Sequence, residues 1–299
     1  MAKLIVITGP TGVGKTKTAI EIALLLNTEI ISADSRQFYK EIPIGTAAPS
    51  PDECKTVPHH FVGHLSVTDY YNAYMYQNQV LKTLKKLFTK HEYVVICGGS
   101  GMYIDAVCNG IDNIPDIDPE LREKVIEQFK SEGIEGLRST VKKLDPEYYS
   151  QVDLKNPVRL MRAIEVCLQT GKTFSSVRTN SQQKRDFSTI HIALTLDREI
   201  LYNRINERVL IMIQNGMIDE ARSVHHLKEY TALKTVGYRE LFDFFEGKID
   251  KKTAIEKIQQ HSRHYAKRQL SWIKRNPDYA WYNPEDISKI FTHIKHSHK

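Results

Sequence analysis

Short apolar runs alternate with helical patterns along most of the chain. The runs span residues 3–8, 29–33, 93–97 and 190–196, and they are rich in β-branched side chains. Such continuous runs are typical of strands that are buried on both faces of a parallel sheet. Patterns of helical period lie beside them, at residues 18–27, 69–90 and 199–215. The alternation predicts an α/β core in which helices flank a parallel sheet.

The pattern changes between residues 115 and 186, where only helix signals occur. A capping residue precedes a proline at each expected helix start, namely Asp118-Pro119, Asp145-Pro146 and Asn156-Pro157. Gly133 and Gly171 are expected to end the first and the last of these helices. We therefore predict an all-helical insertion domain at residues 115–186, which divides the core into residues 1–114 and 187–299. The polar segment 173–185 is expected to be a mobile loop.

The C-terminal part contains a long helical pattern, residues 251–275, and its last part is basic. Residues 261–275 include no acidic side chain. A basic stripe of Arg263, Lys267 and Lys274 lies beside an apolar stripe of Ala266, Leu270 and Ile273, and Tyr265 and Trp272 offer rings for stacking. A basic helix with aromatic residues indicates a nucleic-acid surface. A surface helix that packs through its aromatic residues remains the alternative.

Net charge and cysteine content narrow the possible classes of protein. The chain of 299 residues carries a formal net charge of +6, with a pI of about 8.9. This charge favours a polyanionic partner only weakly, so the location of the basic residues matters more. The four cysteines form no C-x-x-C pair, and neither a structural zinc site nor a disulfide framework is expected. We find no signal peptide and no apolar run of membrane-spanning length, and we expect a reduced, cytoplasmic protein with no membrane partner.

The turn after the first apolar run matches a phosphate-binding loop. Residues 9–16 fit G-x-x-x-x-G-K-[ST], directly after a predicted strand and before a predicted helix. The glycines let successive backbone N–H groups surround an anion at the helix N-terminus, and Thr16 can hold Mg²⁺ through its hydroxyl. The residues predicted to bind a diphosphate or a nucleotide are Gly9, Pro10, Thr11, Gly12, Val13, Gly14, Lys15 and Thr16. The core is therefore expected to be similar to that of the P-loop NTPases.

Polar residues and a second glycine turn follow the other predicted strands. Asp34 comes directly after residues 29–33, and residues at the carboxyl ends of parallel strands line the ligand crevice. Asp34 is therefore expected near the phosphate loop, although an N-cap of a helix is an equal alternative. The turn at residues 98–103 is expected to bring its backbone close to a ligand. Asp197 follows the strand at 190–196 and mimics the magnesium-binding aspartate of phosphate-loop ATPases.

From these residues alone, two classes of enzyme remain open. One is a kinase for a nucleoside or a small metabolite, with a helical lid and Asp197 as its magnesium carboxylate. The other uses the phosphate loop to hold a diphosphate as a leaving group. The sequence contains no guanine-reading N-K-x-D motif, and the strand at 93–97 does not end in aspartate. Several expected parts of a phosphoryl-transfer site are therefore missing.

The chain also resembles the tRNA dimethylallyltransferases. The resemblance rests on motifs that occur in the same order over residues 3–275: Gly9-Pro10-Thr11 through Lys15-Thr16, Asp34-Ser35 with Gln37 and Tyr39, Gly45-Thr46, Pro58-His59, residues 98–103, Asn156-Pro157 with Arg159, Arg162-Ala163 with Glu165-Val166, Val236-Gly237-Tyr238-Arg239, and Ala266-Lys267-Arg268-Gln269 with Trp272. Two departures are conservative, because Gly12-Val13 stands where the family more often has Ala-Ser, and Ser100 stands where Thr is common. The zinc finger of eukaryotic members is absent, which implies a bacterial-type enzyme.

The resemblance implies a reaction and a set of partners. Members of this family transfer a dimethylallyl group from dimethylallyl diphosphate to N6 of the adenosine 3′ of the anticodon, in tRNAs that read codons beginning with U. By resemblance, Asp34 is the catalytic base, and Thr11 and Arg208 act beside the diphosphate, with Mg²⁺ as cofactor. We expect a monomer that binds the anticodon stem-loop of tRNA.

The resemblance also assigns residues to the tRNA. They are Asp34, Ser35, Arg36, Gln37, Ser100, Arg122, Val158, Arg159, Leu160, Met161 and Arg162, and we expect the basic helix to add Arg263, Lys267 and Arg268. Arg159 and Arg162 share one helix face at i, i+3, and without the resemblance a solvated surface explains them equally well. A prenyltransferase for free adenylate is a closer rival, but a mononucleotide would not need the insertion or the basic helix. The intact phosphate loop disfavours an RNA-binding module without enzymatic activity.

Overall fold

The computed structural model describes residues 2–178 and 183–297. The chain forms two compact units, which we call the core unit (residues 1–109 and 184–299) and the helical unit (residues 110–183). The helical unit therefore begins at Gly110, where Pro115 was expected, and ends at Gln183, where Asp186 was expected.

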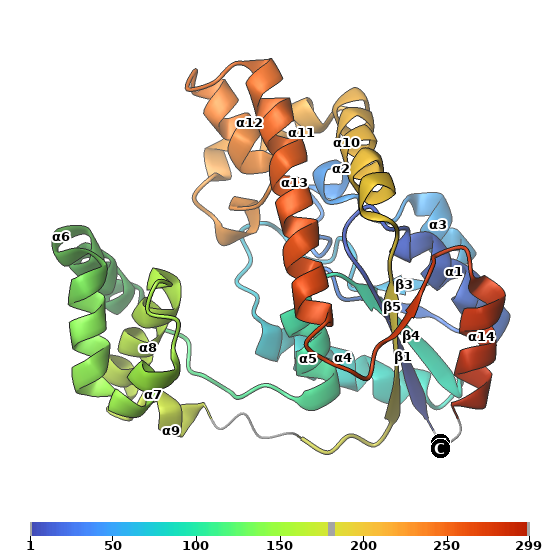
Figure 1. Ribbon diagram of the computed structural model, residues 1–299, viewed down its shortest axis with the longest axis horizontal. Coiled ribbons are helices and arrows are strands. Elements are labelled where there is room, and N and C mark those ends of the chain that lie inside the picture. Colours follow the sequence, from blue (N-terminus) through green and yellow to red (C-terminus); the bar gives the residue numbers. More distant parts are fainter. Residues whose placement is uncertain (1, 179–182, 298–299) are drawn as a thin grey trace. The chain divides into compact units, whose positions relative to one another are not determined.

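One parallel sheet organises the core unit (Figure 1). Its strands are β1 (Lys3–Thr8), β2 (Ile30–Ser32), β3 (His59–His60), β4 (Tyr93–Gly98), β5 (Ser188–Leu194) and β6 (Ala280–Tyr282). Their order is β3-β2-β4-β1-β5-β6, and every neighbouring pair is parallel. The predicted parallel α/β fold is confirmed. The strands β3 and β6 have only two and three residues, too few for an apolar run to predict them.

Side chains of β1 alternate between two hydrophobic cores, one on each face of the sheet. Leu4 and Val6 belong to the core that includes residues of α4 (Ala73–Leu87) and α5 (Gly101–Asn109). Ile5 and Ile7 belong to the core that includes residues of α1 (Lys15–Leu26) and α14 (Ile287–His296). All six residues of β1 are buried, as expected for a central strand covered on both faces.

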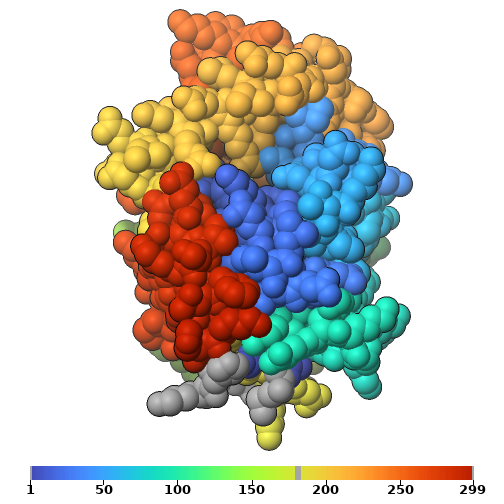
Figure 2. Space-filling view, turned by 90° about the vertical axis from the view of Figure 1, so that its right-hand side faces the viewer, coloured from blue at the N-terminus to red at the C-terminus, as the bar shows by residue number. Residues whose placement is uncertain are grey.

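Further helices of the core unit gather near the carboxyl ends of the strands (Figure 1). They are α2 (Pro43–Thr46), α3 (Pro51–Thr56), α10 (Arg198–Gln214), α11 (Met217–Ser223), α12 (Tyr238–Phe245) and α13 (Lys251–Ile273), with 3₁₀ turns at His225–Leu227 and Thr231–Leu233. The long helix α13 contacts α10, α12 and α5. Figure 2 shows this unit from the side of α1, with α14 and α3 on either side and α10 above.

Helix α4 is shorter than the helical pattern at 69–90 predicts. It begins at Ala73. Asn72 is its N-cap, and the Asn72 side chain accepts a hydrogen bond from the N–H of Met75. Tyr70 therefore precedes the helix and is 59% exposed. The apolar pattern in the sequence begins before the helix, because Tyr70, its first aromatic residue, belongs to the preceding turn.

The helical unit contains α6 (Pro119–Leu144), α7 (Pro146–Gln151), α8 (Pro157–Thr170) and α9 (Phe174–Val177). The three predicted caps accept hydrogen bonds from backbone N–H groups of the helices they precede, which confirms the starts at Asp118, Asp145 and Asn156. Gly171 ends α8 with a φ of 65°. Gly133, with φ 66° and ψ −161°, only interrupts α6, and the helix continues to Leu144. The continuation buries Leu137 and Val141 in the core of this unit.

The segment 173–185 contains more structure than a mobile loop. Thr173 caps the short helix α9, and Phe174 is buried against Tyr148 with ring centroids 4.7 Å apart. The N–H of Ser175 donates to a carboxylate oxygen of the buried Asp145 at 2.7 Å. The prediction of a loop is therefore wrong for residues 173–177, because a single apolar side chain anchors this polar stretch. Residues 179–182 lie outside the described residues.

Candidate active site

The phosphate loop leaves β1 and ends at the first turn of α1. Gly12 and Gly14 have φ values of 81° and 111°, a left-handed backbone that glycine adopts without steric cost. Val13 between them is fully buried in the core beneath the loop. The loop therefore has glycines at the two positions that need a left-handed backbone, and the Val13 side chain anchors it to the core. Gly14 directly precedes α1.

Lys15 lies inside this loop. Its Nζ donates to the carbonyl oxygens of Gly9 and Pro10, both at 3.0 Å. Burial lowers the pKa of Lys15 from 10.5 to about 8, although the nearby negative charge of Asp34 acts in the opposite direction. The ammonium group is thus held by two dipoles that a bound anion could replace.

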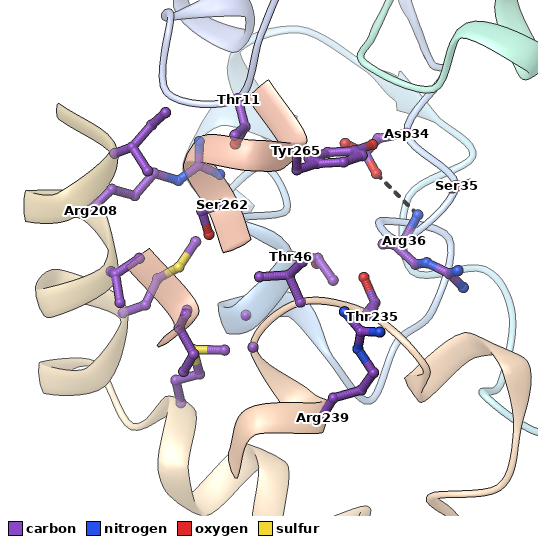
Figure 3. A pocket seen from close by; sticks show the side chains of 18 of the residues that line it. Thr11, Asp34, Ser35, Arg36, Thr46, Arg208, Thr235, Arg239, Ser262 and Tyr265 are labelled. Carbon is purple, nitrogen blue, oxygen red and sulfur yellow. Dashed lines mark hydrogen bonds between the residues drawn. The ribbon is translucent and has the colours of Figure 1, made fainter. Parts of the chain in front are cut away.

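Asp34 follows β2 and lies within electrostatic reach of the loop. One carboxylate oxygen accepts the N–H of Arg36 at 3.0 Å (Figure 3). The same carboxylate opposes the lowering of the pKa values of Lys15 and Arg208, which burial causes. Residues 35–38 form a turn, so Asp34 stabilises a turn instead of capping a helix. This arrangement favours the predicted place of Asp34 near the phosphate loop over the alternative of a helix N-cap.

Two cavities meet at Asp34. One, of about 510 Å³, is lined by residues of the phosphate loop together with Arg204, Glu207 and Arg208 of α10. The other, of about 420 Å³, has an apolar wall made of Ile205, Val209, Met212, Met217, Val236 and Ile258. Both are lined by Thr11, Asp34, Thr46, Arg208 and Tyr265. A phosphate-binding space and a partly apolar space therefore share one boundary, and the predicted base lies on it.

Figure 3 shows how this boundary is built. Thr11 points into the cavity from the phosphate loop, Arg208 reaches in from α10, and Asp34 lies on the opposite side beside the ring of Tyr265. Tyr265 and Ser262 come from α13. Burial raises the pKa of the Tyr265 phenol to about 12, so the hydroxyl is neutral and can donate. Four segments that lie far apart in the sequence thus supply one site.

Gln269 of α13 is a site residue that belongs to a motif of the resemblance but was assigned no role from the sequence. Its Oε1 accepts the N–H of Thr11 at 2.8 Å, and its Nε2 donates to the carbonyl oxygen of Gly99 at 3.0 Å. The side chain is only 6% exposed. It therefore connects the phosphate loop to the second glycine turn. A signal was present, because Gln269 is a polar residue within the apolar stripe of Ala266, Leu270 and Ile273.

The glycines of the second turn make room for neighbouring groups of the protein, and a Cβ at Gly99 would also lie 3.6 Å from Nζ of Lys15. A Cβ at Gly98 would collide with the backbone of Ala33, a Cβ at Gly99 with Gln269, and a Cβ at Gly101 with the ring of Trp272. These glycines therefore allow Ala33, directly after β2, and the side chains of α13 to pack closely against the turn. Ser100 is the exception, since its hydroxyl accepts the N–H of Ser35 at 2.9 Å and donates to the Ser35 hydroxyl at 3.1 Å.

The residues after Asp34 that we assigned to tRNA are used within the protein. The guanidinium of Arg36 donates to the carbonyl oxygens of Thr231 and Ala232, at 3.1 and 3.3 Å. The amide of Gln37 accepts from the Ser32 hydroxyl at 3.1 Å and donates to the carbonyl oxygen of Ala47 at 2.9 Å. These contacts fix the turn that carries Asp34, and Arg36 also lines the cavity of about 420 Å³.

The basic stripe of α13 divides into different environments. Arg268 lines the cavity of Asp34 and lies 5.7 Å from the centroid of the Tyr265 ring. Lys267 is exposed, whereas Arg263 donates to the side-chain oxygen of Asn206 on α10. Arg239 of α12, which we did not select, also lines this cavity and is 56% exposed at its side chain.

In the helical unit, the predicted tRNA residues cluster around one buried carboxylate. Glu165 lies 3.3 Å from Nε of Arg122 and 3.7 Å from Nη1 of Arg162. Val158, which is 67% exposed, and Arg159 lie on the surface at the start of α8. Glu165 therefore explains how two cations are held close together on this surface.

The side chains of Leu160 and Met161, both assigned to tRNA, differ in burial. Leu160 is fully buried in the core of the helical unit, and Met161 packs against that core. The side chain of Leu160 is therefore closed to tRNA, because helical period turns this position inward. Met161 is only partly buried, so its assignment to tRNA is untouched.

Asp197, expected as a strand-end magnesium carboxylate, lines neither of the two cavities. It is exposed and caps α10, where its side chain accepts the N–H of Glu199 at 2.8 Å. The strand before it ends at Leu194, two residues earlier than the apolar run suggests.

Across residues 2–178 and 183–297, no three His, Cys, Asp or Glu side chains are grouped so that they could hold a metal ion. None of the helices in this part of the chain has the length and apolar character needed to cross a bilayer.

Comparison with known proteins decides the family. Residues 37–276 match the model of the IPP transferases. The chain belongs to the IPP transferase family. The tRNA dimethylallyltransferase 1 of Bacteroides fragilis (strain YCH46) is 49% identical to this IPP transferase over 296 residues, which cover 99% of this chain and 98% of the relative. The tRNA dimethylallyltransferase of Christiangramia forsetii is 47% identical, over 98% of this chain and 97% of the relative.

Solved structures agree with this IPP transferase in fold. The crystal structure of a tRNA isopentenylpyrophosphate transferase from Bacillus halodurans has a TM-score of 0.73 and 30% identity, over 99% of this chain and 96% of that one. A eukaryotic dimethylallyltransferase caught acting on tRNA has a TM-score of 0.76 and 25% identity, over 99% of this chain and 77% of that one. The core of this IPP transferase therefore has the P-loop NTPase-like fold, and the protein is a prenyltransferase.

Proposed function

We propose that this IPP transferase moves a dimethylallyl group from dimethylallyl diphosphate to N6 of the adenosine 3′ of the anticodon, in tRNAs that read codons beginning with U. Transfer of a prenyl group to tRNA agrees with the names of relatives that match along the whole chain. The observation that carries the proposal is the shared boundary of the two cavities, where Asp34, Arg208 and Thr11 meet.

The phosphate loop holds the diphosphate of the donor. Its backbone N–H groups and Lys15 surround the phosphates, and Arg208 approaches from α10. When the allylic C1–O bond breaks, negative charge grows on the diphosphate that leaves. Cations and N–H groups already aimed at this charge stabilise the transition state, at about 3–4 kcal/mol for each well-placed donor. The apolar wall of the neighbouring cavity suits the hydrocarbon part of the same donor.

Asp34 acts as the general base. The amine of adenine is a poor nucleophile, because its lone pair is delocalised into the ring. As the C–N bond forms and the C1–O bond breaks, N6 must lose a proton, and the carboxylate of Asp34 accepts it. General-base help of this kind is worth roughly 10²–10⁴-fold in rate. The adenine must first leave the stack of the anticodon loop, at a cost of a few kcal/mol that new contacts offset.

The residues present fit a magnesium ion that arrives with the diphosphate. Mg²⁺ keeps several waters and usually takes only one or two protein ligands beside substrate phosphates. Thr16 lines the phosphate-side cavity, and Glu207 and Glu53 line it as well. The hydroxyl of Thr16 would hold the ion, which would neutralise charge on the diphosphate.

Two surfaces are proposed to bind the anticodon stem-loop, one on each unit. The residues of the surface on the core unit are Ser35, Ser100, Lys267 and Arg268, near the Asp34 cavity. Arg239, which the sequence did not single out, lines the same cavity and joins them. On the helical unit they are Arg122, Val158, Arg159 and Arg162. Loop bases are read by stacking and by hydrogen bonds to their edges, which aromatic and guanidinium groups provide. The enzyme is proposed to act as a monomer in the cytoplasm.

The test uses labelled dimethylallyl diphosphate, Mg²⁺ and an unmodified tRNA with an A-A-A run in its anticodon loop. Label in the tRNA of the wild-type reaction supports the proposal, whereas label in added AMP supports the rival that prenylates free adenylate. Asp34→Asn should lower kcat by about 10²–10⁴-fold and leave tRNA binding nearly unchanged. The matched control is Asp52→Asn, a carboxylate 91% exposed at its side chain on α3. Equal kcat values for the two variants would remove Asp34 as the base.

A further inference from the structure

A carboxylate on α11 holds the segment that forms part of the shared cavity boundary. The two oxygens of Glu220 accept backbone N–H groups of Ile44 at 2.7 Å and Gly45 at 2.8 Å. The hydroxyl of Tyr238, from α12, donates to the same carboxylate at 2.5 Å. Three donors from two elements therefore converge on one side chain, while α2 has no side-chain cap of its own.

The local sequence is shaped to this contact. Tyr238 is fully buried, so its hydroxyl needs a partner inside the protein. A Cβ at Gly45 would collide with the Tyr238 hydroxyl and lie 2.9 Å from the end of the Met217 side chain. The segment is thus locked, that is, held by contacts with Glu220 and Tyr238. Gly45 allows the close approach of the Tyr238 hydroxyl, and the Glu220 carboxylate accepts the hydrogen bonds.

The locked segment, residues 43–48, is connected to Asp34 by hydrogen bonds. The carbonyl oxygens of Thr46 and Ala47 accept from Nε2 of Gln37, at 3.4 and 2.9 Å. Oε1 of Gln37 accepts from the hydroxyl of Ser32 at 3.1 Å, and the same hydroxyl accepts the N–H of Asp34 at 3.4 Å. The chain of contacts therefore runs from α11, through the segment and Gln37, to the backbone of the base.

We propose that Glu220 is a positioning residue for prenyl transfer, because it fixes the segment 43–48 and thereby the place of Thr46 and Asp34. This inference rests on the proposed function. Neither Glu220 nor Tyr238 lines the Asp34 cavity, whereas Gly45 and Thr46 do, so the effect on the substrates is indirect. Misplacement of catalytic groups by about 1 Å costs on the order of 10²-fold in rate.

The main variant is Glu220→Gln, which keeps the volume but turns one acceptor into a donor that faces a backbone N–H. We expect kcat to fall by on the order of 10²-fold, with little change in KM for tRNA or dimethylallyl diphosphate. A modest fall in Tm accompanies it, because one buried backbone N–H loses its acceptor. The matched control is Asp219→Asn, an exposed carboxylate in the first turn of the same helix. A kcat equal to that of the control, or a loss confined to Tm, would overturn the positioning role.

Two further measurements keep the outcome clear. Gln37→Ala combined with Glu220→Gln should lose no more activity than the worse single variant, since both interrupt one chain of contacts; fully multiplicative losses contradict that chain. Hydrogen exchange at the Ile44 and Gly45 amides should accelerate in Glu220→Gln but not in the control. If the wild-type protein transfers no label, the proposed function fails, and the exchange result alone still decides whether Glu220 holds the segment.

Discussion

The two glycine turns of the core unit look alike in sequence and do different work. Both leave central, neighbouring strands of the parallel sheet, β1 and β4. In the first turn, Gly12 and Gly14 have positive φ, and the backbone encloses a space beside Lys15. In the second, the glycines give room for Ala33, Gln269 and Trp272. Close packing is common to both turns, since a Cβ at Gly9 or Gly12 would also collide with Leu194 or Ile205. Positive φ occurs only in the first turn, and this backbone conformation is what distinguishes the phosphate loop.

The largest effect should come from the first turn. Lys15→Met removes the cation that faces the phosphates, and kcat/KM for dimethylallyl diphosphate should fall by about 10²–10³-fold. The free energy of unfolding should change much less, because the side chain lies in an environment that penalises its charge. Steady-state kinetics and denaturant unfolding measure the two quantities. Lys82→Met, at an exposed position of α4, is the control; a variant at Lys15 that retains wild-type kinetics would mean that the loop binds no diphosphate.

The second turn should respond in the opposite way. Gly98→Ala places a methyl group against the backbone of Ala33, and overpacking of this kind costs about 1–3 kcal/mol of the free energy of unfolding. The catalytic groups remain, so the folded fraction should keep a KM for dimethylallyl diphosphate near that of the wild type. Urea unfolding followed by circular dichroism measures the loss. A variant as stable as the wild type but unable to bind the donor would make this turn a ligand loop after all.

A smaller effect depends on pH and sharpens the role of Lys15. Its pKa is lowered to about 8 in the free protein, while a bound diphosphate favours the charged form and raises it. Below about pH 8 the lysine is charged both before and after binding, and affinity is complete. Above that pH the free protein has lost the proton and must take it up on binding, so affinity for inorganic diphosphate should fall up to about tenfold per pH unit. Titration calorimetry in two buffers should detect this uptake, and Lys15→Met should abolish it.

The smallest effect concerns Ser100, whose side chain joins the second turn to Ser35, the residue after Asp34. Ser100→Ala removes the acceptor of the Ser35 N–H and one hydrogen bond between hydroxyls. A loss of about 0.5–1.5 kcal/mol is typical of one such bond, so tRNA affinity should fall only a few fold. Filter binding at fixed salt measures this change. A loss as large as that of Lys15→Met in donor use would assign both turns to the same task.

Local patterns allowed good predictions where one short segment determines the structure. The phosphate loop, the parallel core and the caps at Asp118, Asp145 and Asn156 depend on neighbouring residues, and the structure contains them. Asp197 shows the limit of such patterns, since the same residue type at a strand end serves equally well as a helix cap. Leu160 shows another, because a motif assigns a run of residues whereas helical period buries one of them.

The contacts that complete the site join distant positions and leave little trace in a single sequence. Gln269 lies 258 residues from Thr11, and Glu220 lies 175 residues from Gly45. Neither was assigned a role from the sequence, although Gln269 belongs to a motif of the resemblance and a glutamine within an apolar stripe indicates a buried amide. The exact neighbours of the second glycine turn were equally hidden, because glycine permits both ligand approach and tight packing.

The hydrogen bond between Thr11 and Gln269 can form only late in synthesis on the ribosome. The phosphate loop is among the first parts of the chain to emerge, whereas its partner follows 258 residues later. At about 5–20 residues per second, the interval is on the order of 10–50 s. Nascent and truncated chains that end before α13 therefore carry the loop without its completed surroundings. In such chains the N–H of Thr11 lacks the acceptor that Gln269 supplies, so we expect them to bind the prenyl donor more weakly than the finished protein does.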